Sequence, residues 1–383
     1  AIALEERIDG PFHVGVLLDN EPEYVFWIVG CAFAGAAVVG INSTRRGEEL
    51  ARDVAHTNCQ LLVTDRTHLE LLDGLDLGLP PDRVVLVDSD DYAQRLATHT
   101  GVGLDDVDRQ PAPSDALLLL FTSGSTGAPK AVVCTQGRFA RICQTTPTLF
   151  GVTDADVCYS AMPMFHGNAL MASWALTIGS GAPWAIRRRF SASGFLPDVR
   201  RFGVTYFNYV GRALAYVLAT PEAADDADNT LRLAFGTEAT DRDMVEFGRR
   251  FGCAFAESYG SSEGPISINK SPDAPPTALG KARDGDDVAV IDPATLQECP
   301  RARFGDHGEL VNAEAIGELV RRNADGQFEG YYNNPDATAE RLRNGWYWSG
   351  DLGYRDADGW FYFAGRGADW LRVDSENFAA API

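Results

Sequence analysis

The chain has 383 residues, of which 45% are hydrophobic and 23% are charged, and its formal net charge is -21. This length predicts two or three domains or subdomains, and the residue balance is that of a soluble globular protein. The negative charge disfavours a general nucleic-acid-binding protein, which needs a basic surface, but it still allows a nucleotide held locally by dipoles or Mg²⁺.

The first long apolar run is Val25–Ile41, which has no charged residue. It lies near the lower length limit of a membrane span, about 17 residues, but glycine and alanine dilute it. A strand precedes it, and Asn20 and Pro22 are typical of a helix start. We therefore predict a buried helix here rather than a membrane span.

Short apolar runs alternate with helical stretches through the first two-thirds of the chain. Two helices are expected at Ser191–Phe202 and Thr240–Phe251, the latter capped by Thr240. Strands that are apolar on both faces are typical of covered, parallel sheets, so we predict an α/β fold with layered, largely parallel sheets. The strands are expected at His13–Leu18, Gln60–Thr64, Arg83–Val87, Ala116–Phe121, Ala131–Cys134, Val157–Met162, Thr205–Tyr209, Leu231–Phe235 and Ala254–Ser258.

The character of the sequence changes after Pro272, where prolines and glycine form a linker-like break. The following segment is Gly-rich and strand-like. We predict an α/β core over residues 1–278, a smaller β-rich subdomain over 279–365 and a hinge over 366–383. The strands of the subdomain are expected at Val288–Ile291, Glu318–Arg321 and Trp360–Ala364.

A polar loop follows the predicted strand Ala116–Phe121. Its glycines allow the backbone to approach a ligand closely, while N–H groups, hydroxyls and a lysine can hold phosphate oxygens. It lacks the G-x-x-x-x-G-K-[ST] pattern of a P-loop. An ordinary hairpin is the alternative, but hairpins rarely need seven such residues. The sequence therefore predicts a phosphate-binding loop that comprises Thr122, Ser123, Gly124, Ser125, Thr126, Gly127 and Lys130.

This loop closely resembles the signature of the adenylate-forming superfamily of acyl-CoA synthetases, luciferases and peptide-synthetase adenylation domains. Other motifs resemble that superfamily in the same order: Glu257–Glu263, Gly330–Pro335, Trp346–Asp351 and Gly365–Arg366. The resemblance implies the large N-terminal domain of that fold, with residues 1–278 binding ATP and the acyl group. It also implies that the loop holds the β- and γ-phosphates of ATP.

The resemblance implies roles for individual residues. Thr126, Lys130, His166 and Glu263 would form the catalytic set, and Glu263 would bind Mg²⁺. His166 would position or gate the acyl carboxylate rather than act as a base, because a carboxylate is already nucleophilic. The phosphate loop would bind the nucleotide together with Tyr259 at adenine, Ser262 at the α-phosphate, and Asp351 and Arg366 at the ribose. Gly236, Thr237 and Glu238 would form the adenine shelf, and Gly260 would also belong to the nucleotide site.

These features predict a fatty acyl-CoA synthetase that uses Mg-ATP to form an acyl-adenylate and pyrophosphate, and then a thioester with coenzyme A. Arg187–Ser193, Asn208–Gly211 and Asp369–Asn377 are most similar to the fatty-acid transport protein and very-long-chain acyl-CoA synthetase branch. This similarity implies a long acyl tail and an apolar tunnel for it.

The sequence departs from the family near its end. The sequence ends at Ile383, just past the hinge, so the mobile C-terminal lid of the family is expected to be missing. The lid lysine that promotes adenylation is expected to be missing with it, since the last lysine is Lys281. Ala368 stands where many members carry Asp or Lys, and Asp374 and Ser375 stand where a basic residue and glycine are common. These departures bear on thioester formation more than on adenylation.

Two other functional classes fit parts of the sequence. Gly260–Gly264 matches the G-x-S-x-G elbow of serine hydrolases, with Ser262 as nucleophile and Asp286 and His307 as partners. However, the residues after it look extended, whereas an elbow must begin a helix. A nucleotide- or acyl-binding transport component without ligase activity is the second alternative.

Charged and thiol residues give further expectations. The run Arg187, Arg188 and Arg189 is either a solvated strand end or a patch for CoA phosphates or an anionic membrane surface.

The seven cysteines are odd in number and include no C-x-x-C pair, which argues against disulfides and zinc. We expect buried thiols in a cytoplasmic protein that lacks a signal peptide, with peripheral membrane contact as an option. The oligomeric state is left open.

Overall fold

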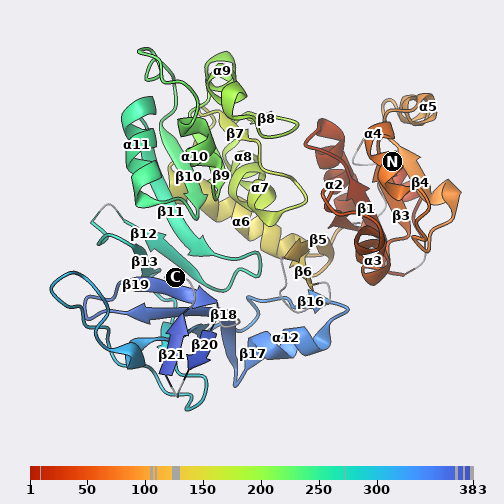
Figure 1. The fold of residues 1–383 in the computed structure, drawn as a ribbon. Helices are drawn as coiled ribbons and strands as arrows, with labels where there is room; N and C mark the ends of the chain where they lie inside the picture. The colour runs from red at the N-terminus through yellow and green to blue at the C-terminus, as the bar shows by residue number, and fades with distance from the viewer. Residues whose placement is uncertain are drawn as a thin grey trace.

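The structure is a computed structural model that describes residues 1–8, 10–103, 107, 110–122, 130–271, 273–366, 370–373 and 376–379. The predicted hinge positions Ala368, Asp374 and Ser375 lie outside these residues. The described residues form two large sheets and a small one that pairs β20 (Trp370–Val373) with β21 (Glu376–Ala379), as Figure 1 shows.

The first sheet has seven strands in the order β16-β6-β5-β2-β1-β3-β4. Its central strands are parallel and are buried on both faces, as their continuous apolar sequences predict. Two antiparallel strands extend one edge. The strands are β1 (His13–Leu17), β2 (Ala37–Gly40), β3 (Leu61–Thr64), β4 (Val84–Leu86), β5 (Ala116–Thr122), β6 (Lys130–Thr135) and β16 (Tyr331–Tyr332).

The second sheet is parallel from β8 to β11 and antiparallel beyond β11, where it continues into the C-terminal β-rich part of the chain (Figure 1). The domain boundary predicted near residue 278 stays a prediction. The strands are β7 (Cys158–Ser160), β8 (Trp184–Ile186), β9 (Tyr206–Val210), β10 (Leu233–Thr237), β11 (Ala254–Gly260), β12 (Ser267–Lys270), β13 (Ala278–Ala282), β14 (Val288–Ile291), β15 (Gly317–Arg321), β17 (Leu342–Arg343), β18 (Trp346–Arg355) and β19 (Phe361–Arg366).

Helices cover both sheets. Apolar side chains of α2, α6, α9 and α11 share one continuous core with strands from both sheets, while α3 packs on the opposite face of the first sheet. The α-helices are α1 (Ile2–Glu5), α2 (Pro22–Ala34), α3 (Glu48–His56), α4 (Arg66–Leu69), α5 (Asp90–Thr98), α6 (Gln136–Phe150), α7 (Gly167–Ala169), α8 (Ala175–Ser180), α9 (Ala192–Phe202), α10 (Ala213–Leu218), α11 (Asp241–Phe251) and α12 (Pro335–Arg341), with a π-helical segment, η4, at Leu170–Trp174.

The prediction of one buried helix over Val25–Ile41 is wrong. The helix α2 ends at Ala34, because Gly35 adopts a left-handed conformation at its C-terminus, and the rest of the run forms β2. The helix is also partly exposed, since Phe26 is 62% exposed. Within the described part of the chain, every helix is too short or too polar to cross a bilayer.

Asn20 joins the two sheets at their seam. Its side-chain amide donates to the carbonyl oxygens of Met162 and Arg187, and its oxygen accepts from the N–H of Met164. The side chain is therefore a bridge between β1 and the loop after β7 rather than the predicted helix cap. The N-terminal flank of α2 is instead Glu21, which makes no side-chain capping bond.

The three consecutive arginines are all engaged in ion pairs. Arg187 contacts Asp198 at 2.6 Å on the second sheet's side. Arg188 contacts Glu21 at 2.5 Å, and Arg189 contacts Asp19 at 2.9 Å, so both reach across the seam to the first sheet. Arg188 and Arg189 therefore link the two sheets, whereas Arg187 does not.

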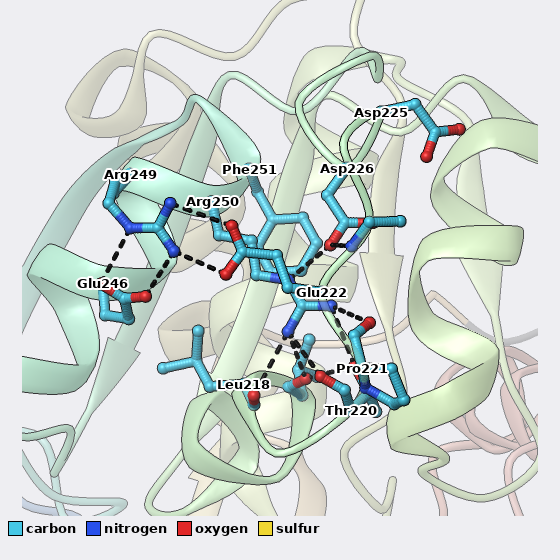
Figure 2. Close-up of polar contacts among 12 residues, drawn as sticks. Leu218, Thr220, Pro221, Glu222, Asp225, Asp226, Glu246, Arg249, Arg250 and Phe251 are labelled. Atoms are coloured by element: carbon cyan, nitrogen blue, oxygen red, sulfur yellow. Dashed lines mark hydrogen bonds and ion pairs between the residues drawn. The ribbon is translucent and has the colours of Figure 1, made fainter.

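A buried arginine fixes the packing of α10 against α11, as Figure 2 shows. The Arg250 side chain is 4% exposed and its Nε lies 2.6 Å from the carboxylate of Asp226, which is 5% exposed. Its two terminal nitrogens donate to the carbonyl oxygens of Leu218, Thr220 and Pro221. The neighbouring Arg249 instead lies at the surface and pairs with Glu222 and Glu246.

All seven cysteines are buried free thiols. Burial raises the pKa of every one of them, for example to about 12 at Cys59. The thiols therefore remain protonated near neutral pH and act as small apolar side chains.

Asp53 on α3 should make the free energy of unfolding depend on pH. Its side chain is fully buried beside Arg45, at 2.9 Å, and burial raises its pKa to about 6 in spite of that arginine. The folded state therefore holds this proton at a pH where the unfolded chain releases it. The resulting stabilisation is complete below the unfolded pKa of about 4 and is lost as the pH rises through 6.

Asp53→Asn removes this titration. We expect the free energy of unfolding of the variant, relative to the wild type, to rise by about 2.5 kcal/mol between pH 4 and pH 7. Urea unfolding at several pH values measures the difference. The exposed Asp82→Asn serves as a control and should show a flat difference. A flat difference for Asp53→Asn as well would mean that Asp53 ionises normally in the folded protein.

Candidate functional site

The predicted phosphate loop lies between β5 and β6, which form an antiparallel hairpin. Thr122 ends β5 and Lys130 begins β6, and they are register partners. The hydroxyl of Thr122 donates to the carbonyl oxygen of Lys130 at 3.5 Å, which closes the base of the loop. The loop positions Ser123, Gly124, Ser125, Thr126 and Gly127 lie outside the described residues.

The predicted metal ligand Glu263 lies in the turn between β11 and β12 and is 7% exposed. Its Oε1 accepts a hydrogen bond of 2.7 Å from the hydroxyl of Tyr331 on β16. The ammonium group of Lys130 lies 5.8 Å from the centre of the Tyr331 ring, within the range of a cation–π contact. The carboxylate and the lysine at the base of the loop are thus brought together around one tyrosine.

Arg138 at the start of α6 holds the turn that carries Glu263. Its guanidinium donates to the carbonyl oxygen of Ser262 at 2.6 Å and to that of Val133 at 3.2 Å. Gly264 has a φ of +89°, and a Cβ there would lie 2.3 Å from the arginine. Only glycine fits this position without displacing the arginine, so the turn depends on both residues.

Ser262 lies next to the segment that carries His166. A Cβ on Gly167 would lie 3.0 Å from the Ser262 hydroxyl, so the Ser262 side chain lies close to the Gly167 backbone. His166 itself is exposed, at the start of α7, and the surrounding protein nevertheless lowers its pKa by desolvation. A histidine that stays neutral near pH 7 fits a positioning role beside an anion better than a charge-neutralising one.

The predicted adenine shelf forms the end of β10. Gly236 packs against the ring of Tyr209, and a Cβ at Gly236 would lie 2.4 Å from that ring. Glu238 has a φ of +68°, which turns the chain sharply away from the strand. The carboxylate of Glu257 on β11 accepts from the Tyr209 hydroxyl and from the N–H of Ala239, both at 3.2 Å, and so fixes this turn.

Tyr259 and Asp351 meet across the second sheet. The hydroxyl of Tyr259 on β11 donates to Oδ2 of Asp351 on β18 at 2.5 Å. Arg366 on β19 is the register partner of Asp351, and its Nε lies 3.7 Å from the other carboxylate oxygen. Burial raises the pKa of Asp351, whereas Tyr259 and Arg366 act in the opposite direction.

The structure does not support the hydrolase alternative. Gly260 ends β11, and the next element is the strand β12 rather than a helix. Asp286 is paired with Arg321 at 2.6 Å, and the backbone N–H of His307 bonds to Glu309. The side chain of Asp286, one of the two proposed partners of Ser262, is therefore engaged elsewhere.

The sequence interpretation missed two residues of this site. Tyr331 lies within the recognised Gly330–Pro335 motif, so the motif contained a signal for its importance but not for its contact with Glu263. Arg341 at the end of α12 lies in no recognised motif, yet its Nε lies 3.4 Å from the Tyr331 hydroxyl. The fold is needed to find it.

Comparison with known sequences identifies the family. Residues 7–332 match the family described as AMP-binding enzyme. The steroid-22-oyl-CoA synthetase of Rhodococcus jostii is 54% identical over all of this chain and 69% of its own length. A medium/long-chain-fatty-acid–CoA ligase of Mycobacterium marinum is 44% identical, again over the whole chain and over 72% of its own length.

Comparison with solved structures supports the fold. ATP-bound MatB from Rhodopseudomonas palustris matches 98% of this chain and 73% of its own chain, with a TM-score of 0.80 at 22% identity. The anthranilate–CoA ligase AuaEII, in complex with anthranoyl-AMP, matches 97% of this chain and 71% of its own, with a TM-score of 0.80 at 19% identity. These matches confirm the predicted α/β fold of the N-terminal adenylate-forming domain.

The sequence relatives confirm the predicted superfamily, and they support the fatty-acid–CoA ligase branch. They do not favour the alternative of a binding component without ligase activity. The chain therefore belongs to the AMP-binding enzyme family, as an acyl-CoA synthetase, that is, an ATP-dependent, AMP-forming acid–CoA ligase.

Proposed function

We propose that this enzyme activates an acid with a large apolar body, either a medium- or long-chain fatty acid or a steroid side-chain acid, and transfers the acyl group to coenzyme A. The observation that supports this reaction most directly is that three segments of the chain contact one another. The turn with Ser262 and Glu263 contacts both Gly167, beside His166, and Tyr331, beside Lys130. Groups for the acid and for the phosphates thus converge at one place.

The proposed roles follow from charge and position. The acyl carboxylate must attack the α-phosphorus of ATP, which is also anionic, so positive charge and fixed geometry are required. Lys130 supplies charge at the base of the phosphate loop, and His166 positions the carboxylate. Asp351 and Arg366 bind the ribose hydroxyls. Tyr259, Gly236, Thr237 and Glu238 surround adenine, and Ser262 and Gly260 lie at the α-phosphate.

Glu263 fits the role of a Mg²⁺ ligand. Mg²⁺ in nucleotide sites usually keeps several waters and takes only one or two protein carboxylates together with substrate phosphates. Glu263 is a buried carboxylate whose Oε1 accepts a hydrogen bond from Tyr331, and the Tyr331 ring lies near Lys130. When bound, the ion would neutralise phosphate charge. The protein's part is to hold the carboxylate and exclude water around it.

Two buried polar side chains favour the steroid acid as a second candidate substrate. Asn208 on β9 and Ser160 on β7 are register partners, 0% and 1% exposed. Within the described residues, neither side chain has a hydrogen-bond partner. Buried polar groups usually bind an ordered water or a ligand oxygen, and the ring system of an oxygenated steroid acid can offer such an oxygen whereas the hydrocarbon tail of a fatty acid cannot.

A panel of acids tests the proposed substrate class. For fatty acids, we expect KM to fall by about fourfold for each added methylene that is buried, the equivalent of about 0.8 kcal/mol. ATP-dependent pyrophosphate release with each acid provides the measurement. A preference for acetate or benzoate over the long-chain and steroid acids would reject an extended apolar site.

A substitution separates the two substrate candidates. Asn208→Leu should lower kcat/KM for an oxygenated steroid acid by about tenfold while lauric acid is little affected, because only the steroid acid loses a polar partner. Equal losses for both acids would instead assign Asn208 a purely structural role.

The run Arg187, Arg188 and Arg189 does not favour membrane contact. Each guanidinium is already paired with a carboxylate of the same chain. Binding to anionic lipid would have to compete with these pairs. Arg188 and Arg189 therefore support the seam between the two sheets.

A further inference from the structure

Tyr331 and Arg341 connect the two carboxylates of the site. The Tyr331 hydroxyl donates to Glu263 at 2.7 Å, and Arg341 donates to the same hydroxyl at 3.4 Å. Arg341 also donates to the carbonyl oxygen of Trp348 at 3.3 Å, three residues before Asp351. One half-buried guanidinium thus joins the Glu263 side of the site to the Asp351 side.

The turn before Asp351 is shaped around this arginine. Gly350 has a φ of +77°, and a Cβ there would lie 2.1 Å from a terminal nitrogen of Arg341. A side chain at this position would therefore displace the guanidinium. The N–H of Gly350 donates to Glu318, so the turn is held from its other side as well.

The charge of Arg341 also acts on the neighbouring acids. Burial raises the pKa of both Asp351 and Glu318, and the positive charge of Arg341 acts against that rise in each case. Removing this charge would leave several buried carboxylates with less compensation. The guanidinium is therefore placed to favour the ionised forms of the acids around it.

The strand β16 directs adjacent tyrosines to opposite sides, as the period of a strand requires. Tyr331 points to Glu263, whereas the Tyr332 hydroxyl accepts from Asn58 at 3.0 Å and its ring contacts His13 edge-on at 4.8 Å. Tyr332 anchors the strand on the first sheet. The two hydroxyls therefore have separate partners, on opposite sides of the strand.

We propose that Tyr331 and Arg341 are positioning residues. They hold Glu263 in its metal-binding orientation and keep the turn Trp348–Asp351 at a fixed position relative to Glu263. The proposal rests on the proposed roles of Glu263 as Mg²⁺ ligand and of Asp351 at the ribose. The Tyr331 bond engages one carboxylate oxygen, so the other is presented to the ion in a single orientation. Partners of this kind typically contribute about 10- to 100-fold to metal affinity.

The first test replaces only the hydroxyl of Tyr331. For Tyr331→Phe in the full-length protein, we expect the Mg²⁺ concentration that gives half-maximal ATP–pyrophosphate exchange to rise by about tenfold or more. The rate should recover at saturating Mg²⁺, and the KM for the acid should stay as in the wild type. Tyr332→Phe is the matched control, because it removes the hydroxyl that points the other way, and its Mg²⁺ requirement should be unchanged.

The second test concerns Arg341. Arg341→Met should raise both the Mg²⁺ requirement and the KM for ATP, because it removes the contacts of Arg341 with Tyr331 and with the carbonyl oxygen of Trp348. Arg341→Lys keeps the charge but loses the forked geometry, so it should restore part of the loss. Arg343→Met is the control for the Mg²⁺ requirement alone, because Arg343 contacts Glu318 and Trp348 but is not a partner of Tyr331.

A double-mutant comparison decides between this proposal and simpler ones. In a Glu263→Gln background, Tyr331→Phe should have little further effect on the Mg²⁺ requirement, because its target is already altered. If Glu263→Gln raises the Mg²⁺ requirement and Tyr331→Phe does not, the positioning role is overturned. If Glu263→Gln itself leaves the Mg²⁺ requirement unchanged, the proposed metal role of Glu263 fails instead. A loss of thermal stability in Tyr331→Phe with a normal Mg²⁺ requirement would show a purely structural tyrosine.

Discussion

Glu263→Gln is expected to lower the rate of acyl-adenylate formation by about 30- to 1,000-fold, equivalent to about 2–4 kcal/mol of transition-state stabilisation. The substitution removes one negative charge from the proposed Mg²⁺ site and keeps the shape of the side chain. The Tyr331 hydroxyl can still donate to the amide oxygen, so the fold should be retained. ATP–pyrophosphate exchange over a range of Mg²⁺ concentrations measures the effect.

A second, half-buried carboxylate provides the comparison. Glu257 lies on the strand that leads into the same turn, but its Oε1 already accepts bonds from Tyr209 and Ala239. Glu257→Gln should therefore leave the Mg²⁺ requirement as it is in the wild type, whatever it does to the adenine shelf. Normal adenylation by Glu263→Gln at limiting Mg²⁺ would exclude Glu263 from the metal site.

Arg250→Met is expected to destabilise the protein by about 3–5 kcal/mol, because it leaves the buried carboxylate of Asp226 without its partner. The carbonyl oxygens of Leu218, Thr220 and Pro221 lose their donor at the same time. Hydrogen exchange at the amides of α11 under increasing urea reports the free energy of opening of this region.

Two further variants show where the loss arises. Arg249→Met, at the surface position beside it in Figure 2, should change stability little, because exposed ion pairs contribute little. Replacing both buried partners, as in Asp226→Leu/Arg250→Met, should recover much of the loss, since no unpaired charge remains. A loss at Arg250→Met no greater than at Arg249→Met would contradict the account of a buried pair.

Much of the fold could be predicted from local sequence. The strands β1, β3 and β14 and the helices α9 and α11 have nearly their predicted bounds, because continuous apolar runs and capping residues are local signals. The run Val25–Ile41 misled the prediction because a single glycine, Gly35, divides a helix from a strand within one apolar segment. The hydrophobic pattern of the run does not change at this glycine, so the sequence does not show that the helix ends there.

Only those residues of the candidate site that lie within recognised motifs could be predicted from the sequence. The segments with Glu263 and Asp351 were recognised because chemically specific residues recur at fixed spacing. The contacts that hold these residues could not be predicted in this way. Tyr331 reaches Glu263, and Arg341 reaches Trp348, only because distant strands are brought together by the sheets.

The strand β16 also sets an order on the assembly of the molecule. It closes the edge of the first sheet by pairing with β6, and the side chain of Glu329 just before it bonds to Thr135, 194 positions earlier. During synthesis, one edge of β6 therefore stays unpaired until most of the chain has been made. Unpaired edges of this kind invite pairing with other chains. The first sheet is thus completed only when residue 332 has been made, although its other strands are encoded within the first 135 residues.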